Sequence, residues 1–321
     1  MTTSATWGVV STIKAPADEI IQFAAYHLDL GAAQITICLD DDNPAAQQAL
    51  EAHPKCQAIR TDRAYWQDLC GYRPKKHQFR QAMNASHVYA QSQGLDWLAH
   101  IDVDEFLCPD RNIGQSLAAL PANLQVARVS PCESLCLEDQ PHVDPRLTYC
   151  KARPGPEHSS RELERDLYPE FGGFFRDGFI SHTVGKIFVR TGLEDLHFGI
   201  HRGLDSEKQQ IPDQILRDVE LCHRHVESWD KWQSIMGFRL TRGSYRPELG
   251  QNVNPASGRM SKHALFTALQ EEGSEGLRGF FEETCLATPR LLDRLSAHGL
   301  LRKYALELSP KVEKHFPGFL L

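Results

Sequence analysis

Residues 97–106 read WLAHIDVDEF, and the interpretation of the whole chain starts from this stretch. It begins as an apolar strand and ends in three carboxylates, at Asp102, Asp104 and Glu105. Residues two apart on a strand point to the same face, so the pattern predicts that Asp102 and Asp104 project together. In an open α/β sheet, ligands bind beyond the carboxyl ends of the strands, where this cluster is expected to lie.

The acidic cluster predicts a metal site. Two neighbouring carboxylates repel each other unless a cation or a proton lies between them, and oxygen ligands of this type suit Mg²⁺ or Mn²⁺. Substrate phosphates would complete the coordination shell. The alternative is a solvated acidic turn after a strand, because the Asp-x-Asp tripeptide is common. The apolar strand before Asp102 and the residues after Asp104 favour the metal site.

Outward from this stretch, the first half of the chain alternates strand and helix signals. Strands are expected at residues 7–13, 34–39, 57–60, 97–103 and 125–129, and helices at 17–30, 44–52 and 75–93. This alternation predicts an α/β fold with a parallel sheet that helices cover on both faces.

The second half has a different character. Residues 151–173 are rich in proline, glycine and charge, which predicts a long loop that acts as a lid or has no fixed structure. Strand-like pieces follow within 174–190, a helix is expected at 227–242, and residues 246–258 read as irregular. The remainder is expected to form short helices. We therefore predict a large α/β domain over residues 1–245 and a helical C-terminal extension over 246–321.

A second acidic strand end lies at residues 39–43, LDDDN. Asp40 is a candidate for hydrogen bonds to a nucleobase or to ribose hydroxyls, as acidic residues make at other strand ends. The alternative is that this segment caps the helix that begins at Pro44, since Asp and Asn are good N-cap residues. The two roles are compatible.

A basic cluster, residues 73–77, opens the helix that precedes the acidic strand. A helix N-terminus with adjacent cations is a natural diphosphate site, which makes Lys76 a candidate and Arg73 a weaker one. The alternative is a solvated basic surface.

Histidines concentrate in the second half. His197, His201, His223 and His225 fall within thirty residues of one another, and an imidazole is a plausible third ligand for a metal held by two aspartates. A structural or surface role is the alternative for each of them. No cysteine or histidine lies at zinc-finger spacing from His223 and His225.

Composition excludes several classes of protein. The net charge of −7 argues against a general nucleic-acid binder, which needs a basic face. No apolar run approaches the ~20 residues of a membrane span, and the N-terminus lacks a signal-peptide pattern. The nine cysteines form no CxxC pair, so a reducing cytoplasm is the expected setting. The absence of a Walker loop argues against a P-loop ATPase.

Several stretches together resemble family 2-like glycosyltransferases. The similar segments are residues 26–31 (YHLDLG) before the Asp/Asn-rich turn, 97–107 (WLAHIDVDEFL), 185–190 (GKIFVR), His201-Arg202, and His223 to Ser228 leading into Trp229 and Lys231. They occur in the family's order and cover roughly residues 7–245. The chain departs from the pattern at Arg224, where an aromatic is usual, and at Gly203, where proline is usual.

The resemblance implies a GT-A fold, a Rossmann-like sheet flanked by helices, and a nucleoside-diphosphate sugar donor, UDP being the commonest. It implies that Asp102 and Asp104 bind a divalent cation, with His223 as the later histidine near the metal. The expected partners are this donor and a glycan or other hydroxyl acceptor, as in polysaccharide biosynthesis. A peripheral membrane contact stays open, and no nucleic acid is expected.

In such a reaction the diphosphate leaves with developing negative charge. The metal would neutralise it, and Lys76 or Lys186 would add to this effect. Family 2-like enzymes are typically inverting, which requires a carboxylate to deprotonate the acceptor. The candidates for this base are Asp177, Glu105 and Glu133. The competing functions are metal-dependent phosphoryl or nucleotidyl transfer and non-catalytic nucleotide or sugar binding.

Overall fold

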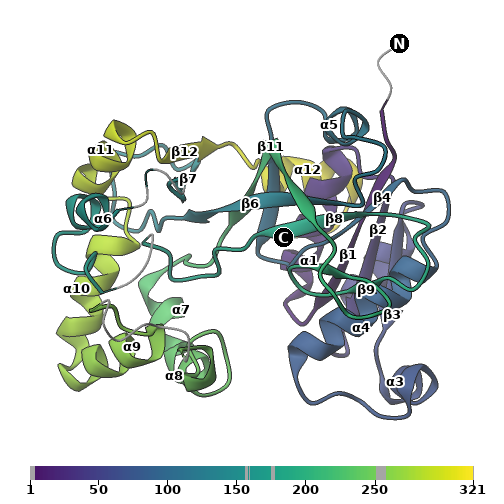
Figure 1. Cartoon of the computed structure of the whole chain (residues 1–321), viewed down its shortest axis with the longest axis horizontal. Coiled ribbons are helices and arrows are strands. Elements are labelled where there is room, and N and C mark those ends of the chain that lie inside the picture. Colours follow the sequence, from purple (N-terminus) through teal and green to yellow (C-terminus); the bar gives the residue numbers. More distant parts are fainter. Residues whose placement is uncertain (1–3, 156–157, 159, 175–177, 251–257, 321) are drawn as a thin grey trace. The chain divides into compact units, whose positions relative to one another are not determined.

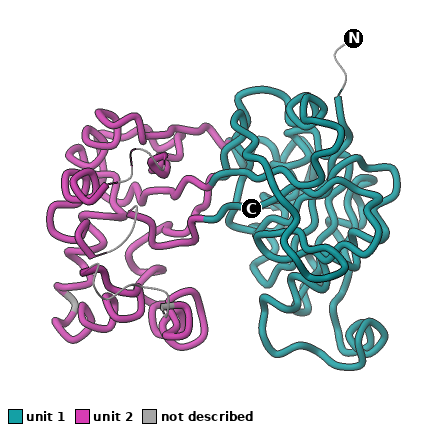
Figure 2. The backbone as a smooth tube through the Cα atoms, in the orientation of Figure 1, with its two compact units in different colours: residues 1–130, 184–221, 307–321 teal, residues 131–183, 222–306 magenta. Residues whose placement is uncertain are grey.

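The structure is a computed structural model that describes residues 4–155, 158, 160–174, 178–250 and 258–320. It divides into two compact units, distinguished by colour in Figure 2. Unit 1 comprises residues 1–130, 184–221 and 307–321, and unit 2 comprises residues 131–183 and 222–306. The predicted boundary at residue 245 falls inside unit 2, because residues on both sides of it pack into one hydrophobic core.

Unit 1 is an α/β unit with a mixed sheet flanked by helices (Figure 1). Its elements are β1 (Trp7–Ile13), α1 (Ala17–Asp29), β2 (Gln34–Leu39), α2 (Pro44–Glu51), β3 (Cys56–Arg60), α3 (Arg63–Cys70), α4 (His77–Ala90), β4 (Trp97–His100), β5 (Glu105–Pro109), α5 (Ile113–Ala118), β8 (Lys186–Arg190), β9 (His197–Phe198), β10 (Gly203–Leu204) and α12 (Leu308–His315). Strands β6 (Val126–Ser134) and β11 (Asp213–His223) begin in unit 1 and end in unit 2.

The sheet of unit 1 is parallel only in its first half. β3, β2, β1 and β4 are neighbours in that order and run parallel, whereas β8 runs antiparallel to both β4 and β6. The prediction of a parallel sheet is therefore confirmed for the first four strands, and the sheet as a whole is mixed. The carboxyl ends of β2, β3 and β4 lie along one edge, which positions the residues that follow them.

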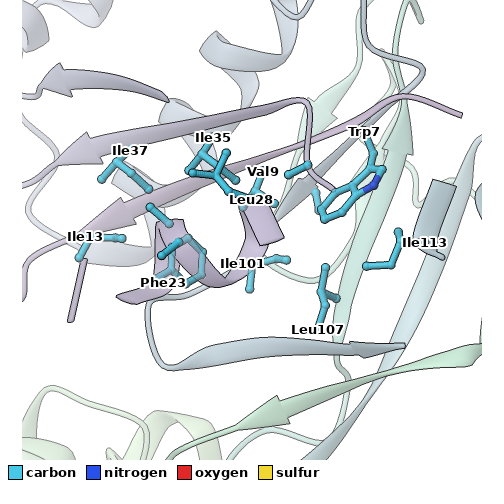
Figure 3. Close-up of a cluster of buried hydrophobic side chains, with 14 of the residues drawn as sticks. Trp7, Val9, Ile13, Phe23, Leu28, Ile35, Ile37, Ile101, Leu107 and Ile113 are labelled. Carbon is cyan, nitrogen blue, oxygen red and sulfur yellow. The ribbon is translucent and has the colours of Figure 1, made fainter. Parts of the chain in front are cut away.

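Alternation along the strands explains why helices cover both faces of this sheet. Val9 and Ile13 of β1 belong to the core that contains Phe23 of α1 and also α12, as the close-up in Figure 3 shows for its labelled members. Val10, between them, belongs to a second core with Val88 of α4 and with β9. Successive side chains of a strand point to opposite faces, so β1 contributes to both cores.

Unit 2 is built from helices around a short antiparallel ladder. Its elements are β7 (Thr148–Ala152), α6 (Arg161–Leu167), α7 (Trp229–Ser234), α8 (Met236–Thr241), η1 (Pro247–Gly250), α9 (Lys262–Glu271), α10 (Ser274–Thr284), α11 (Pro289–Ala297) and β12 (Leu301–Tyr304). β7 pairs with the end of β6 and with β12. The core is aromatic: Trp232 contacts the rings of Phe266 and Phe281.

Three expectations about local structure are corrected. β4 ends at His100 rather than at residue 103. The expected loop 151–173 contains α6, which begins where the Ser160 hydroxyl accepts from the N–H of Leu163. The expected helix 227–242 is two helices, α7 and α8, that meet at Ile235. Among the helices of the described residues, none combines the length and apolar character needed to cross a bilayer.

Candidate functional site

The acidic stretch after β4 forms a tight turn. The N–H of Glu105 donates to the carbonyl of Asp102 at 3.0 Å. The Glu105 carboxylate in turn accepts from the N–H of Asp102 at 2.8 Å. Asp102 and Asp104 therefore belong to a turn, and the expectation that they share one face of a strand is wrong, because the strand has already ended.

Lys186, the first residue of β8, brings a buried ammonium to this turn. Its Nζ lies 2.6 Å from Oδ2 of Asp102 and 3.4 Å from Oε2 of Glu105. Its side chain is only 1% exposed. Burial alone would lower the pKa of Lys186, but the carboxylates of Asp102 and Glu105 outweigh this effect and raise the pKa above its ordinary value. The Lys186 ammonium therefore stays charged and lies against the carboxylates of the turn.

Two predicted roles change with this geometry. Glu105 is fully buried and holds both Lys186 and the backbone of Asp102, so its position favours fixing the turn over deprotonating an acceptor. Lys186 was expected to meet the donor diphosphate, and the structure places its ammonium against Asp102 and Glu105 instead. Both residues therefore help to hold the acidic turn in place.

The turn keeps an excess of negative charge. Among the described residues, Asp102 and Glu105 contact the ammonium of Lys186, and Asp104 adds a third negative charge that acts on it. Asp102 stays 28% exposed at its side chain, and Asp104 is half-buried. Gln81 of α4 donates its side-chain amide to Oδ1 of Asp102 and fixes that carboxylate. Partly exposed, oriented carboxylates with surplus negative charge fit a hard divalent cation such as Mg²⁺ or Mn²⁺.

Asp40, which follows β2, binds two arginines through its carboxylate. Arg73 donates to its Oδ1 at 2.8 Å, and Arg80 donates to its Oδ2 at 2.6 Å. Burial would raise the pKa of Asp40, but hydrogen bonds from His77 and Arg80 and the charges of both arginines hold it well below its ordinary value. The residue that caps helix α2 is Asn43, not Asp40: the Asn43 side chain accepts from the N–H of Ala46.

A pocket of about 680 Å³ lies beyond the ends of β2 and β3. Its walls combine the acidic group Asp41, Asp42 and Asp62, the basic group Arg60, Arg63 and Arg73, and the ring of Tyr72. Tyr72 is 65% exposed, so its ring is available to a planar ligand. Asp40 also lines this pocket, and it acts there chiefly by positioning Arg73.

Helix α4 connects the pocket with the acidic turn. Arg80 binds Asp40 and the next residue, Gln81, binds Asp102. β2 and β4, which these aspartates follow, both pair with β1. Lys76 is exposed just before α4 and lies with its Nζ 6.0 Å from the centre of the Phe79 ring. The two acidic strand ends therefore share one sheet edge and one helix.

The predicted metal ligand His223 lies in unit 2, at the end of β11, in a row of three histidines. Its ring centre is 5.1 Å from that of His182 and 5.0 Å from that of His225. Nε2 of His225 lies 3.1 Å from the hydroxyl of Tyr245. Burial above all, and then the charge of Arg239, lowers the pKa of His225 well below its ordinary value. The His225 imidazole is therefore neutral at pH 7.

The other predicted histidines lie in unit 1. His201 donates through Nδ1 to the carbonyl of Gly185 at 2.8 Å, and His197 is exposed on β9. His201 thus fixes the chain just before Lys186. These histidines are close in sequence to His223, and the sequence gave no indication that they lie in a different unit.

The remaining candidates for the catalytic base are Glu133 and Asp177. Glu133 is buried in unit 2, pairs with Lys151 at 3.1 Å, and accepts from the N–H of Ser181 at 2.6 Å. Although burial would raise it, the ammonium of Lys151 and the Ser181 hydrogen bonds lower the pKa of Glu133 to about 2. These contacts give Glu133 a structural role. Asp177 lies outside the described residues.

Sequence reasoning missed four residues: two that orient the acidic groups, one in the pocket and one in unit 2. Gln81, Arg80, Tyr72 and Arg239 were not singled out, and none belongs to a recognisable motif. The one available signal was position: Arg80 and Gln81 follow the basic cluster at the start of α4 by one helical turn.

No protein-family model matches this chain, and no curated protein matches it significantly. The chemistry of the described residues therefore carries the functional assignment.

Proposed function

We propose that the protein is a metal-dependent glycosyltransferase that uses a nucleoside-diphosphate sugar, with a GT-A type arrangement of unit 1. One observation supports this most: the acidic turn and the pocket both stand at the carboxyl ends of parallel strands in one sheet. Ligands of open α/β sheets bind at that edge. The resemblance of residues 97–107 to family 2-like enzymes points to the same reaction.

The acidic turn and the pocket of unit 1 have separate roles in this proposal. A divalent cation at Asp102 and Asp104 would neutralise the leaving diphosphate. The pocket would hold the nucleoside, with Tyr72 stacking on the base and the carboxylates of Asp41 and Asp62 accepting from ribose or base groups. The sequence-based assignment of His223 as a further metal ligand is retained as part of the proposal.

Of the three sequence-based candidates for the general base, we propose Asp177. Glu105 and Glu133 each hold a buried lysine, and a base must reach the acceptor hydroxyl within hydrogen-bond distance. Asp177→Asn is expected to reduce sugar transfer about 10²-fold or more while leaving nucleotide binding unchanged. Equal transfer rates in the variant and the wild type would remove Asp177 from this role.

Calorimetric titration tests the central claim. UDP and GDP are titrated into the full chain with and without Mn²⁺, and the titrations are repeated with Asp104→Ala and with the exposed control Asp110→Ala. One nucleotide is expected to bind in the presence of Mn²⁺, with affinity at least about tenfold weaker in Asp104→Ala, which corresponds to about 1.4 kcal/mol. Absence of binding of both nucleotides under either condition contradicts the proposal.

The second candidate is metal-dependent phosphoryl or nucleotidyl transfer, because carboxylates around a divalent cation serve that chemistry equally well. Products separate the two reactions. A transferase releases the nucleoside diphosphate and attaches the sugar to an acceptor, whereas a phosphoryl- or nucleotidyl-transfer enzyme breaks a bond within the diphosphate or a phosphodiester. A protein that binds the nucleotide without any turnover would be a binding module.

A further inference from the structure

Arg239 of α8 is a buried cation with only neutral hydrogen-bond partners. The residue is 9% exposed, and its guanidinium donates to the Tyr245 hydroxyl at 3.3 Å and to the carbonyl of His225 at 3.2 Å. Among the described residues, no carboxylate lies within 4 Å of it. Removing a charge from water costs several kcal/mol unless an opposite charge compensates, so this arrangement calls for an anion.

Lys262, the first residue of α9, is a second cation with a neutral hydrogen-bond partner, and it is partly buried. Its Nζ donates to the carbonyl of Ser181, again a neutral acceptor. Glu133 acts on its charge electrostatically, but that carboxylate already pairs with Lys151 and accepts from the N–H of Ser181. A cation in the first turn of a helix also meets the positive end of the helix dipole. The local surplus of positive charge therefore remains.

Each cation contacts the backbone at or next to a residue of the histidine row: Arg239 donates to the carbonyl of His225, and Lys262 to that of Ser181, the neighbour of His182. The charges of Arg239 and Lys262 both act on the ring of His225, which contacts Tyr245 and His223. We call Arg239, Lys262 and the neutral imidazole of His225 the cationic cluster, after its two charged members. It combines a planar guanidinium, an ammonium and an imidazole, which are the donors that proteins use for phosphate and carboxylate groups.

We propose that the cationic cluster of unit 2 binds an oxyanion, phosphate or carboxylate, of a substrate. The guanidinium provides oriented N–H donors, and the ammonium of Lys262 supplies a second charge on the same site. In the proposed function, two substrates carry such a group: the diphosphate of the donor, or an acidic group on the acceptor. Only this choice of source rests on the proposed function.

Phosphate binding to the full chain tests the cluster without nucleotide or metal. Inorganic phosphate is compared with chloride at constant ionic strength by calorimetry, for the wild type, Arg239→Gln and the exposed control Arg242→Gln. The wild type and Arg242→Gln are expected to bind phosphate, and Arg239→Gln to bind at least tenfold more weakly. Circular dichroism checks that each variant is folded, and Lys262→Gln provides the same test if Arg239→Gln does not fold.

Absence of phosphate binding in the wild type, or equal binding by the wild type and both cluster variants, would overturn the proposal. Two further titrations distinguish the source. Weaker binding of UDP with Mn²⁺ to Arg239→Gln assigns the oxyanion to the donor diphosphate. Unchanged UDP binding, with loss of binding to the sugar acid glucuronate, assigns it to the acceptor. Failure of the wild type to bind any nucleotide would refute the proposed function and leave the phosphate result valid.

Discussion

The two units differ in the sign of the charge that their buried ionisable groups leave uncompensated. At the acidic turn of unit 1, three carboxylates act on one lysine, and the surplus charge is negative. In unit 2, Glu133 and Lys151 neutralise each other, while Arg239 and Lys262 add a positive surplus. A surplus of one sign is costly in a folded protein unless a ligand compensates it. The difference therefore separates a candidate cation site from a candidate anion site within one chain.

The largest expected effect concerns the neutralised pair of unit 2. Lys151→Met leaves Glu133 buried without its partner and is expected to lower the free energy of unfolding by about 3–5 kcal/mol. Urea unfolding followed by circular dichroism measures the loss. The matched control is Lys303→Met, an exposed lysine of β12, for which a change within about 0.5 kcal/mol is expected. A loss below about 1 kcal/mol for Lys151→Met would show that the pair is dispensable, and the comparison would fail.

A smaller effect is expected at Asp40 in unit 1, since Arg73 is nearly half exposed and water can solvate it. Asp40→Asn should lower the free energy of unfolding by about 2 kcal/mol at pH 7. The folded-state pKa lies below the unfolded value of about 3.9, so this stabilisation is present above that value and is lost as the pH falls through the folded-state pKa. The difference between wild type and variant should thus shrink below pH ~4. Asp42→Asn, at an exposed residue, should show neither effect.

The smallest effect concerns Lys262 and has the opposite sign. Burial lowers the pKa of Lys262 to about 8, so between pH ~8 and ~10.4 the unfolded state binds more protons than the folded state. Wild-type stability should therefore rise with pH across this window relative to Lys262→Met. At pH 7 the variant is expected to be more stable by about 1 kcal/mol, because it no longer holds a partly buried cation without a contacting carboxylate. A destabilised variant with no pH dependence would mean that Lys262 is already compensated.

Local patterns predicted much of the fold of unit 1. The β-branched residues of 7–13 and 34–39 gave strands with the observed bounds, because alternation and apolar character are properties of the segment itself. The end of β4 was not predictable in the same way. Ile101 and Val103 continue the apolar alternation, but hydrogen bonds between Asp102 and Glu105 close a turn there. Lys186, far along the chain, pairs with both carboxylates, and this long-range contact is not visible in the local pattern.

The candidate site shows the same limit. Asp102 and Asp104 were found because a strand that runs into carboxylates is visible in the sequence. Lys186 was chosen as a cation for the diphosphate, but its partner could not be read from a sequence. Arg239 carries no signal at all, since an arginine on a short helix is ordinary until its burial is known. Electrostatic roles depend on burial and on partners, which are tertiary properties.

Helix α12 has a consequence for synthesis of the chain. Val312 and Phe316 belong to the same core as Phe23 of α1, and Lys314 binds Asp29 at 2.6 Å. Unit 1 therefore begins with the first strand on the ribosome but cannot complete its core until about 300 residues later, roughly 15–60 s at the usual 5–20 residues per second. Through that interval the part of α1 that α12 later covers stays exposed, and it is a natural binding surface for chaperones.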